Sequence, residues 1–114
     1  MNNLRNRVQL IGHLGNDPEI KTFDGGKIKA KFSMATSEYY KKENGEKVTE
    51  TQWHNIVVWN GTAKIIEKLL KKGNEVAIEG KLTSRSWDDK DGNKRYITEV
   101  IANDFILFNR PKSE

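Results

Sequence analysis

The segment from residue 27 to residue 36 alternates almost without error between apolar and polar side chains. Successive side chains of an extended strand point to opposite faces, so this period predicts a half-buried β-strand. Its apolar face carries Ile28, Ala30, Phe32 and Met34, and its polar face carries Lys27, Lys29, Lys31 and Ser33. Three lysines on one face indicate either a solvated exterior or a row of phosphate contacts.

Four further segments have strand character and are separated by turn residues. They cover residues 7–14, 49–59, 75–87 and 96–108. A Gly-Asn-Asp-Pro turn ends the first of them, and the charged stretch from Tyr39 to Lys47 predicts a hairpin loop. Gly12 lies inside the first strand and predicts a bulge or a tight bend, as a barrel corner requires.

One segment between these strands has the period of a helix. Thr62 is placed to cap its amino end, and Gly73 is placed to stop it. Its predicted apolar stripe consists of Ile65, Ile66, Leu69 and Leu70. The lysines on the rest of its surface are typical of a solvated face.

The order of elements is therefore three strands, a helix and two further strands, in a chain of 114 residues. This order and size predict a mainly β protein, a five-stranded Greek-key barrel of the OB (oligonucleotide-binding) type with one helix between strands 3 and 4. No repeat or linker-like composition divides the chain, so we expect one domain over residues 1–108 and a short tail over residues 109–114.

The residue types that most enzymes and metal sites need are scarce. The chain has no cysteine and two histidines, which disfavours a tetrahedral zinc site. The acidic loop at residues 88–93 does not bind calcium by the EF-hand pattern, because Thr98 stands where a carboxylate is needed. It is better interpreted as a turn with Gly92 at positive φ. Motifs for a serine nucleophile or a phosphate loop are absent, so we expect no catalytic residues, no metal and no cofactor.

Membrane and secretion signals are also missing from the sequence. The longest purely apolar runs have four residues, and the amino end lacks the apolar stretch of a signal peptide. We therefore expect a soluble cytoplasmic protein with no membrane partner.

The aromatic residues suggest what such a barrel would bind. Trp53 and Trp59 share one face of their predicted strand, and at ~3.3 Å per residue they stand about 20 Å apart. Exposed rings at that spacing suit the bases of an extended single strand, and each stack is worth roughly 1–3 kcal/mol whatever the base. A formal net charge of +4 favours a polyanionic partner. The alternative is that both indoles belong to the core, where large apolar groups are needed.

In combination, these segments resemble the bacterial single-stranded DNA-binding protein family of the homotetrameric OB-fold type. The matching stretches are residues 7–19, 35–38 (Ala-Thr-Ser-Glu), 51–57 (Thr-Gln-Trp-His-Asn-Ile-Val), 70–73 (Leu-Lys-Lys-Gly) and 76–82 (Val-Ala-Ile-Glu-Gly-Lys-Leu), with Trp87 and the pair Arg95-Tyr96. They follow the family's order over about residues 5–108. The resemblance implies a homotetramer that coats single-stranded DNA in replication, recombination and repair, associated with the nucleoid.

The resemblance also implies site residues. The base-stacking positions fall on Tyr40, Trp53, Trp59 and Trp87, where Tyr40 replaces the usual Trp and Trp59 the usual Phe. The phosphate-contact positions fall on Lys41, Asn55, Lys72 and Arg85, and His54 falls at a subunit interface. The acidic tip through which family members recruit replication and repair enzymes is absent from this chain, so no such recruitment is expected. Two alternatives stay open: an RNA-binding OB module, and a replication-restart scaffold whose rings contact a protein.

Overall fold

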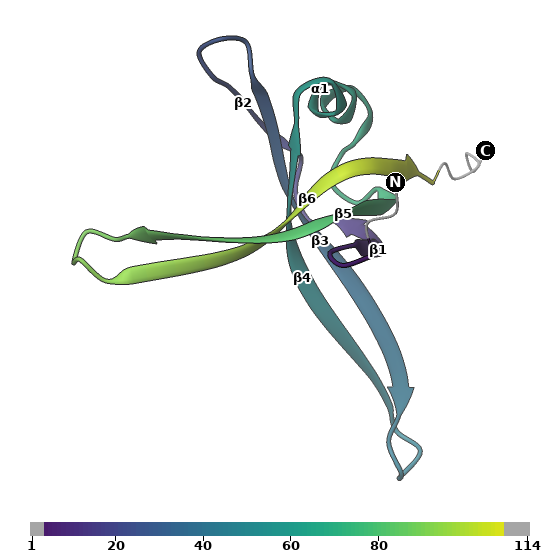
Figure 1. Cartoon of the computed structure of the whole chain (residues 1–114). Helices are drawn as coiled ribbons and strands as arrows, with labels where there is room; N and C mark the ends of the chain where they lie inside the picture. The colour runs from purple at the N-terminus through teal and green to yellow at the C-terminus, as the bar shows by residue number, and fades with distance from the viewer. Residues whose placement is uncertain (1–3, 109–114) are drawn as a thin grey trace.

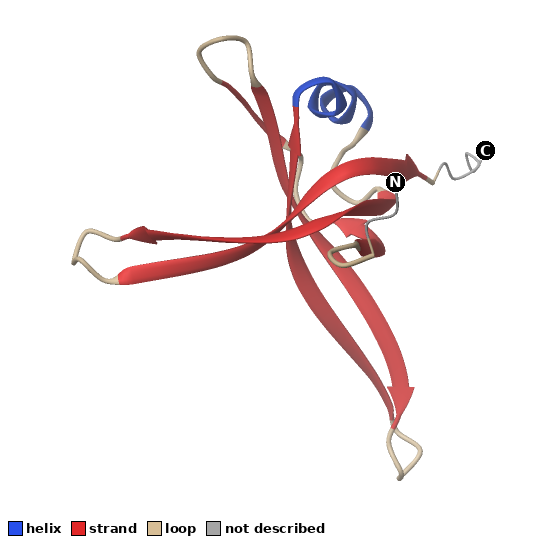
Figure 2. Cartoon of the chain, in the orientation of Figure 1, coloured by secondary structure: helices blue, strands red, loops and turns tan. Residues whose placement is uncertain are grey.

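The computed structural model describes residues 4–108 as six strands and one helix (Figures 1 and 2). The elements are β1 (Val8–Leu14), β2 (Glu19–Thr22), β3 (Ile28–Lys41), β4 (Lys47–Trp59), α1 (Asn60–Leu69), β5 (Glu75–Asp88) and β6 (Lys94–Leu107). The tail expected over residues 109–114 lies outside the described residues. No helix in the described part of the chain is long and apolar enough to cross a membrane.

Five of the strands close into a barrel, as the sequence predicts. The sheet order is β1-β5-β6-β4-β3-β2, and a second pairing of β1 with β3 closes the ring. All pairings are antiparallel except that of β4 with β6, where Ile56 lies beside Val100. The helix follows β4, which is the third strand of the barrel in chain order, so the predicted position of the helix is confirmed.

The sequence reading missed β2, which pairs with the start of β3 at the edge of the sheet. It has only four residues, of which Ile20 alone turns toward the core. Alternation over so short a stretch is too weak to distinguish a strand from a turn.

The core fills the barrel with the apolar faces of β3, β4 and β5 and one face of α1. Its largest fully buried side chains are Phe32, Met34, Ile56, Val58, Ile66, Leu70, Val76 and Ile78. The inward face predicted for β3 is therefore confirmed. Because Phe32 and Met34 point inward, the lysines that alternate with them point to solvent or to a ligand.

Of the two alternatives expected at Gly12, a bulge or a tight bend, the bulge is wrong. The register of β1 with β5 runs without a shift through Gly12. Gly12 is needed instead for a close approach, since a Cβ there would lie 2.0 Å from the carbonyl oxygen of Ala35 on β3. The register shift occurs between Glu79 and Gly80, opposite β6, where a Cβ on Gly80 would lie 2.1 Å from the Ile101 carbonyl oxygen.

The helix begins earlier and is turned differently from the prediction. Trp59 is its N-cap and no side chain caps it, so the capping role predicted for Thr62 is wrong. The buried positions are Ala63, Ile66 and Leu70, whereas Ile65 and Leu69 are half exposed. The small Ala63 allows the helix to pack closely against the barrel. The buried stripe therefore runs through Ala63, Ile66 and Leu70, at positions i, i+3 and i+7, and leaves Ile65 and Leu69 at its edge.

Both hairpins are longer than predicted and extend beyond the barrel as arms (Figure 1). β3 and β4 stay paired as far as Lys41 and Lys47, so four of the nine residues in the loop predicted from Tyr39 to Lys47 are strand. The true turn covers residues 42–46 and is closed by a hydrogen bond from the Lys42 amide to the Glu46 carbonyl. The arm of β5 and β6 ends in a turn at residues 89–93.

Candidate nucleic-acid interface

The face of β3 and β4 turned away from the core holds four of the eight predicted ligand-contacting residues, and we call it the outer face. Cross-strand neighbours on this face are Ala35 with Trp53, Ser33 with Asn55, Lys31 with Val57 and Lys29 with Trp59. Of the lysines predicted along one side of β3, Lys29 thus lies opposite Trp59 and Lys31 lies opposite the buried Val57, whereas Trp53 lies opposite Ala35. Cations and rings therefore share one face, with the cations gathered at the Trp59 end.

All three indoles are accessible to a ligand. The exposed fraction is 63% for Trp53, 37% for Trp59 and 44% for Trp87. The alternative that Trp53 and Trp59 are core residues is therefore wrong. Their inward-facing neighbours on β4, Ile56 and Val58, fill that role instead.

Trp53 rests on the loop that follows β1. A Cβ on Gly15 would lie 2.5 Å from Cζ3 of Trp53, so only glycine lets the indole lie this close to the backbone. Asn16 fixes the loop against β3, because its Oδ1 accepts hydrogen bonds from the Ser33 amide at 2.8 Å and the Ser33 hydroxyl at 2.7 Å. One side of the indole is thereby supported, and the rest is open.

Lys72 is tied to the same loop. It lies in the connection between α1 and β5, and its amide donates to Oδ1 of Asp17 at 2.9 Å. The adjacent Gly73 amide donates to the Leu14 carbonyl at 2.9 Å. The loop at residues 14–17 therefore contacts both a predicted stacking ring and the backbone of a predicted phosphate-contacting residue.

Trp59 has an aromatic neighbour that sequence reasoning did not identify. The ring centroid of Phe23 lies 5.9 Å from that of Trp59, with 33° between the planes. Each ring also has an ammonium group over it: Lys21 Nζ lies 5.2 Å from the Phe23 centroid and Lys29 Nζ lies 5.7 Å from the Trp59 centroid. Exposed cation–π contacts are worth about 0.5–1 kcal/mol, which is less than a base stack.

The third indole sits on the arm of β5 and β6. The Arg85 guanidinium lies 5.5 Å from the Trp87 ring centroid, and its Nε lies 3.1 Å from Oε1 of Glu99. Glu99 is the one buried charged residue among those described. The Glu99 carboxylate holds the Arg85 guanidinium over the indole. Because this ion pair partly neutralises its charge, Arg85 attracts a phosphate less strongly than a solvated lysine does.

Tyr40 and Lys41 lie farther out, on the arm of β3 and β4. Tyr40 pairs with Val48, which places it on the opposite face of the hairpin from Trp53, while Tyr39 alternates onto the face of Trp53. Both tyrosines are exposed. Lys41 pairs with Lys47, so two cations meet at the end of this arm.

His54, the residue predicted at a subunit interface, is half-buried on the inward-facing side of β4. Its Nε2 lies 2.9 Å from the Thr36 hydroxyl. Within one chain, this hydrogen bond fixes the ring beside the base of the β3–β4 arm.

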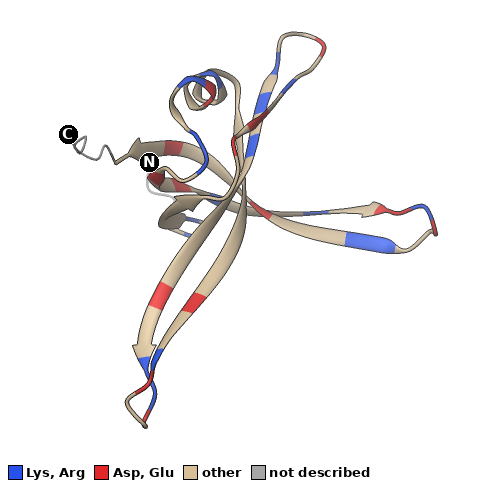
Figure 3. Ribbon diagram, turned by 180° about the vertical axis from the view of Figure 1, so that it is seen from behind, with Lys and Arg blue, Asp and Glu red and all other residues tan. Residues whose placement is uncertain are grey.

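Charge is unevenly distributed between the two ends of β3 (Figure 3). The barrel end carries Lys27, Lys29 and Lys31, and β2 adds Lys21. The arm carries Glu38 directly opposite Glu50, on the face that also carries Tyr40. A phosphate chain would therefore be attracted to the barrel end of the outer face and repelled from the acidic pair on the other face of the arm.

The turn between β5 and β6 is organised by Asp89. Hydrogen bonds from the Arg95 side chain and then from the Asn93 and Asp91 amides hold the pKa of this carboxyl below its ordinary value. Gly92 has φ of 80°, which confirms the predicted turn. In the described part of the chain, no group of three potential ligands is placed to hold a metal ion.

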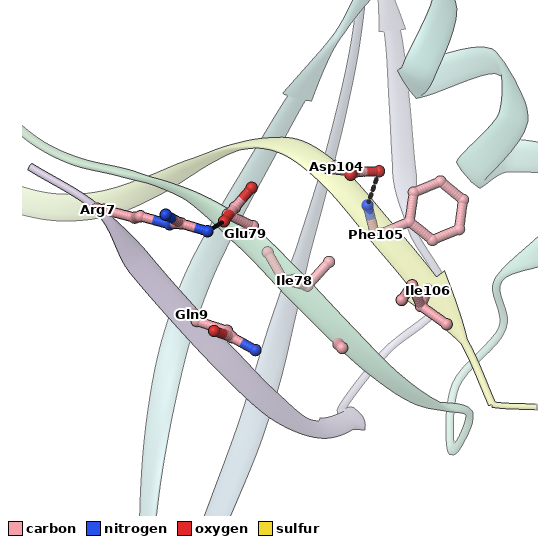
Figure 4. A pocket seen from close by; sticks show the side chains of 8 residues that line it. Arg7, Gln9, Ile78, Glu79, Asp104, Phe105 and Ile106 are labelled. Atoms are coloured by element: carbon pink, nitrogen blue, oxygen red, sulfur yellow. Dashed lines mark hydrogen bonds and ion pairs between the residues drawn. The ribbon is translucent and has the colours of Figure 1, made fainter. Parts of the chain in front are cut away.

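A separate hollow of about 190 Å³ lies on the β1–β5–β6 side of the barrel (Figure 4). It is lined by Arg7, Gln9, Ala77, Ile78, Glu79, Asp104, Phe105 and Ile106. Arg7 and Glu79 form an ion pair across its edge. Ligand pockets usually measure about 300–1,000 Å³, so this hollow is too small for a typical cofactor.

Comparison with known proteins agrees with this geometry. A sequence model described as the single-strand binding protein family matches residues 5–108. The chain is 49% identical over 109 residues to single-stranded DNA-binding protein 1 of Chlorobaculum tepidum, covering 95% of this chain and 67% of that protein. It is 42% identical over 106 residues to the protein of the same name from Xylella fastidiosa, covering 92% and 78%.

Two solved structures are similar in fold. The Plasmodium falciparum SSB in complex with ssDNA superposes with a TM-score of 0.84 at 36% identity, covering 91% of this chain and 95% of that one. A deletion mutant of the single-stranded DNA binding protein from Thermus aquaticus superposes with a TM-score of 0.79 at 28% identity, covering 91% and 50%.

Proposed function

The chain belongs to the single-strand binding protein family, and from this membership and its outer face we propose that it binds and protects single-stranded DNA without sequence preference. It is a DNA-binding protein and not an enzyme. The observation that carries the proposal is the presence of open rings and lysines on one face of β3 and β4, where Lys29 lies directly opposite Trp59. Every base offers a π-face, so stacking on these rings does not discriminate among sequences.

The roles of individual residues follow from their placement. Trp53, Trp59 and Trp87 stack on bases, and Tyr40 stacks on a base that reaches the other face of the β3–β4 arm. Lys41, Asn55, Lys72 and Arg85 contact the phosphate backbone. The loop at residues 14–17 contacts both Trp53 and Lys72. This shared support favours a site where Trp53 stacks on one base while Lys72 binds a neighbouring phosphate.

The chain acts as a homotetramer in the cytoplasm, associated with the nucleoid. His54 marks one subunit contact, as the family resemblance implies. The exposed Ile11 on β1 supports a second apolar contact surface, because an isoleucine on the outside of a small barrel gains by being covered. Four such barrels would provide a long wrapping path for one DNA strand.

Titration with poly(dT) tests the proposal. Stacking on the indoles should quench tryptophan fluorescence, and the affinity should fall with salt at a log–log slope near −0.7 per neutralised phosphate. Poly(rU) of equal length distinguishes the RNA-binding alternative, and a duplex of equal length controls for charge alone. Weak, salt-insensitive binding of poly(dT) would contradict the proposal and favour a protein-binding scaffold.

A further inference from the structure

The neighbouring rings of Phe23 and Trp59 form what we call the two-ring platform. We propose that Phe23 is itself a base-contacting residue, and that the two-ring platform takes one nucleobase whose flanking phosphates are bound by Lys21, Lys27 and Lys29. This inference rests on the proposed function and extends the binding surface onto the β2–β3 hairpin.

Three adjacent strands bring these groups together. Lys21 on β2 pairs with Lys29 on β3, and Lys29 pairs with Trp59 on β4. At the end of the hairpin the Phe23 amide donates to the Lys27 carbonyl at 2.8 Å. Side chains directly across a sheet share a face, so the cations and both rings lie on the outer face.

The platform borders a hollow large enough for a base. Phe23, Lys27, Trp59 and Asn60 line a space of about 470 Å³, within the usual range for small-molecule sites. Asn60 has φ of 58°, a left-handed conformation that asparagine adopts more readily than most non-glycine residues. This conformation turns the chain from β4 into α1 directly after Trp59.

The lysines around the platform are available to a ligand. In residues 4–108 the ion pairs are made by Arg7, Arg85 and Arg95, and none by Lys21, Lys27 or Lys29. The ammonium groups over the rings make only the weaker cation–π contact. A base that stacks on a ring therefore displaces a lysine, which is then free to pair with a phosphate.

Photocrosslinking tests the contact in the unaltered protein. A dT oligomer substituted with 5-iododeoxyuridine is irradiated in the complex, and the protein is digested with trypsin. Cleavage after Lys21 and Lys27 releases peptide 22–27, in which Phe23 is the only aromatic residue. We expect an adduct on this peptide as well as on peptide 48–64, which contains both Trp53 and Trp59, and on peptide 86–90, which contains Trp87.

The outcomes separate the inference from the function on which it rests. Adducts on the tryptophan peptides with none on peptide 22–27 would overturn the role of Phe23 and leave the proposed function intact. A protein that fails to bind the oligomer at all would contradict the proposed function.

Variants distinguish base contact from simple support of Trp59. Phe23→Leu keeps apolar packing and removes the ring, and we expect it to weaken binding of a labelled dT oligomer about five-fold, at the low end for one stack. Phe23→Tyr keeps the ring and should bind within two-fold of the wild type. Phe108→Leu makes the same change at an exposed ring at the end of β6 and should have no effect. Equal affinity of Phe23→Leu and Phe108→Leu would refute the inference.

Discussion

The replacement Trp53→Ala tests the stacking mechanism at its most exposed ring. A tryptophan side chain presents up to about 250 Å², so the 63% that is exposed amounts to about 160 Å². A base covering half of that removes about 80 Å² from water, which at ~25 cal/mol per Å² is worth about 2 kcal/mol. This is about thirty-fold in Kd and lies within the range measured for base–aromatic stacks.

The same arithmetic limits the effect of Trp53→Ala on folding. The buried remainder of the residue, about 90 Å², corresponds to at most about 2 kcal/mol of stability, because extended-chain areas are upper bounds. The barrel should therefore stay folded by circular dichroism at 25 °C.

Affinity for a labelled dT oligomer is the assay, and Ile106→Ala is the matched control. Ile106 is about as exposed as Trp53 but lies on β6 beside the separate hollow. The reasoning is refuted if Trp53→Ala binds within two-fold of the wild type while remaining folded, or if Ile106→Ala loses as much affinity.

Three other changes test the framework around the site. Arg85→Ala should lower the free energy of unfolding by about 1–3 kcal/mol, because it leaves the buried Glu99 carboxylate without its partner; urea unfolding that matches the wild type would contradict this. Gly12→Ala should destabilise by about 3 kcal/mol or more, since its Cβ meets the Ala35 carbonyl, whereas Gly61→Ala meets nothing within 4 Å and should be tolerated. Asp89→Asn removes a carboxylate whose pKa is depressed in the folded state, so its stabilising effect is present above the ordinary value of 3.8 and is lost as the pH falls below it. The variant should therefore be less stable than the wild type at pH 7, and the difference should shrink as the pH falls below 3.8; a difference that stays constant in acid would count against the assignment.

The barrel could be predicted because its strands have recognisable inward faces. The alternation of Phe32 and Met34 with lysines marks the inward face of β3 directly in the sequence. On β4 the strand period places Trp53 and Trp59 on one face, but it did not decide whether that face is core or solvent, and residues 56–58 of this strand are all buried. Five of the six strands and the position of the helix were accessible in this way.

Features that depend on which backbones meet were not accessible. Gly12 and Gly80 are both glycines inside strands, and the sequence does not distinguish their roles. Only the strand pairing shows that β3 approaches Gly12, and that the register with β6 shifts at Gly80. The helix phase was wrong because Ala63, which packs against the barrel, has a weaker apolar signal than the exposed Ile65 and Leu69.

The site was predicted in part for the same reason. Trp53 and Trp59 lie within a clear strand, but Phe23 lies between the short β2 and a glycine turn, where no period assigns it a face. Arg85 and Glu99 are 14 residues apart in the sequence and lie on different strands, so their ion pair could not be predicted without the register of β5 with β6. The row of lysines on β3 was the only sequence signal near the two-ring platform. The structure shows that one of them, Lys29, lies directly opposite Trp59.

The most direct test of the account is a ¹H–¹⁵N spectrum of the indole Nε1–H groups. The chain has three tryptophans and should give three such resonances. If bases stack on the open rings, a dT oligomer and a dA oligomer should each shift all three resonances, because ring contact does not depend on base identity. Indole resonances that stay in place while the oligomer binds would contradict the central claim.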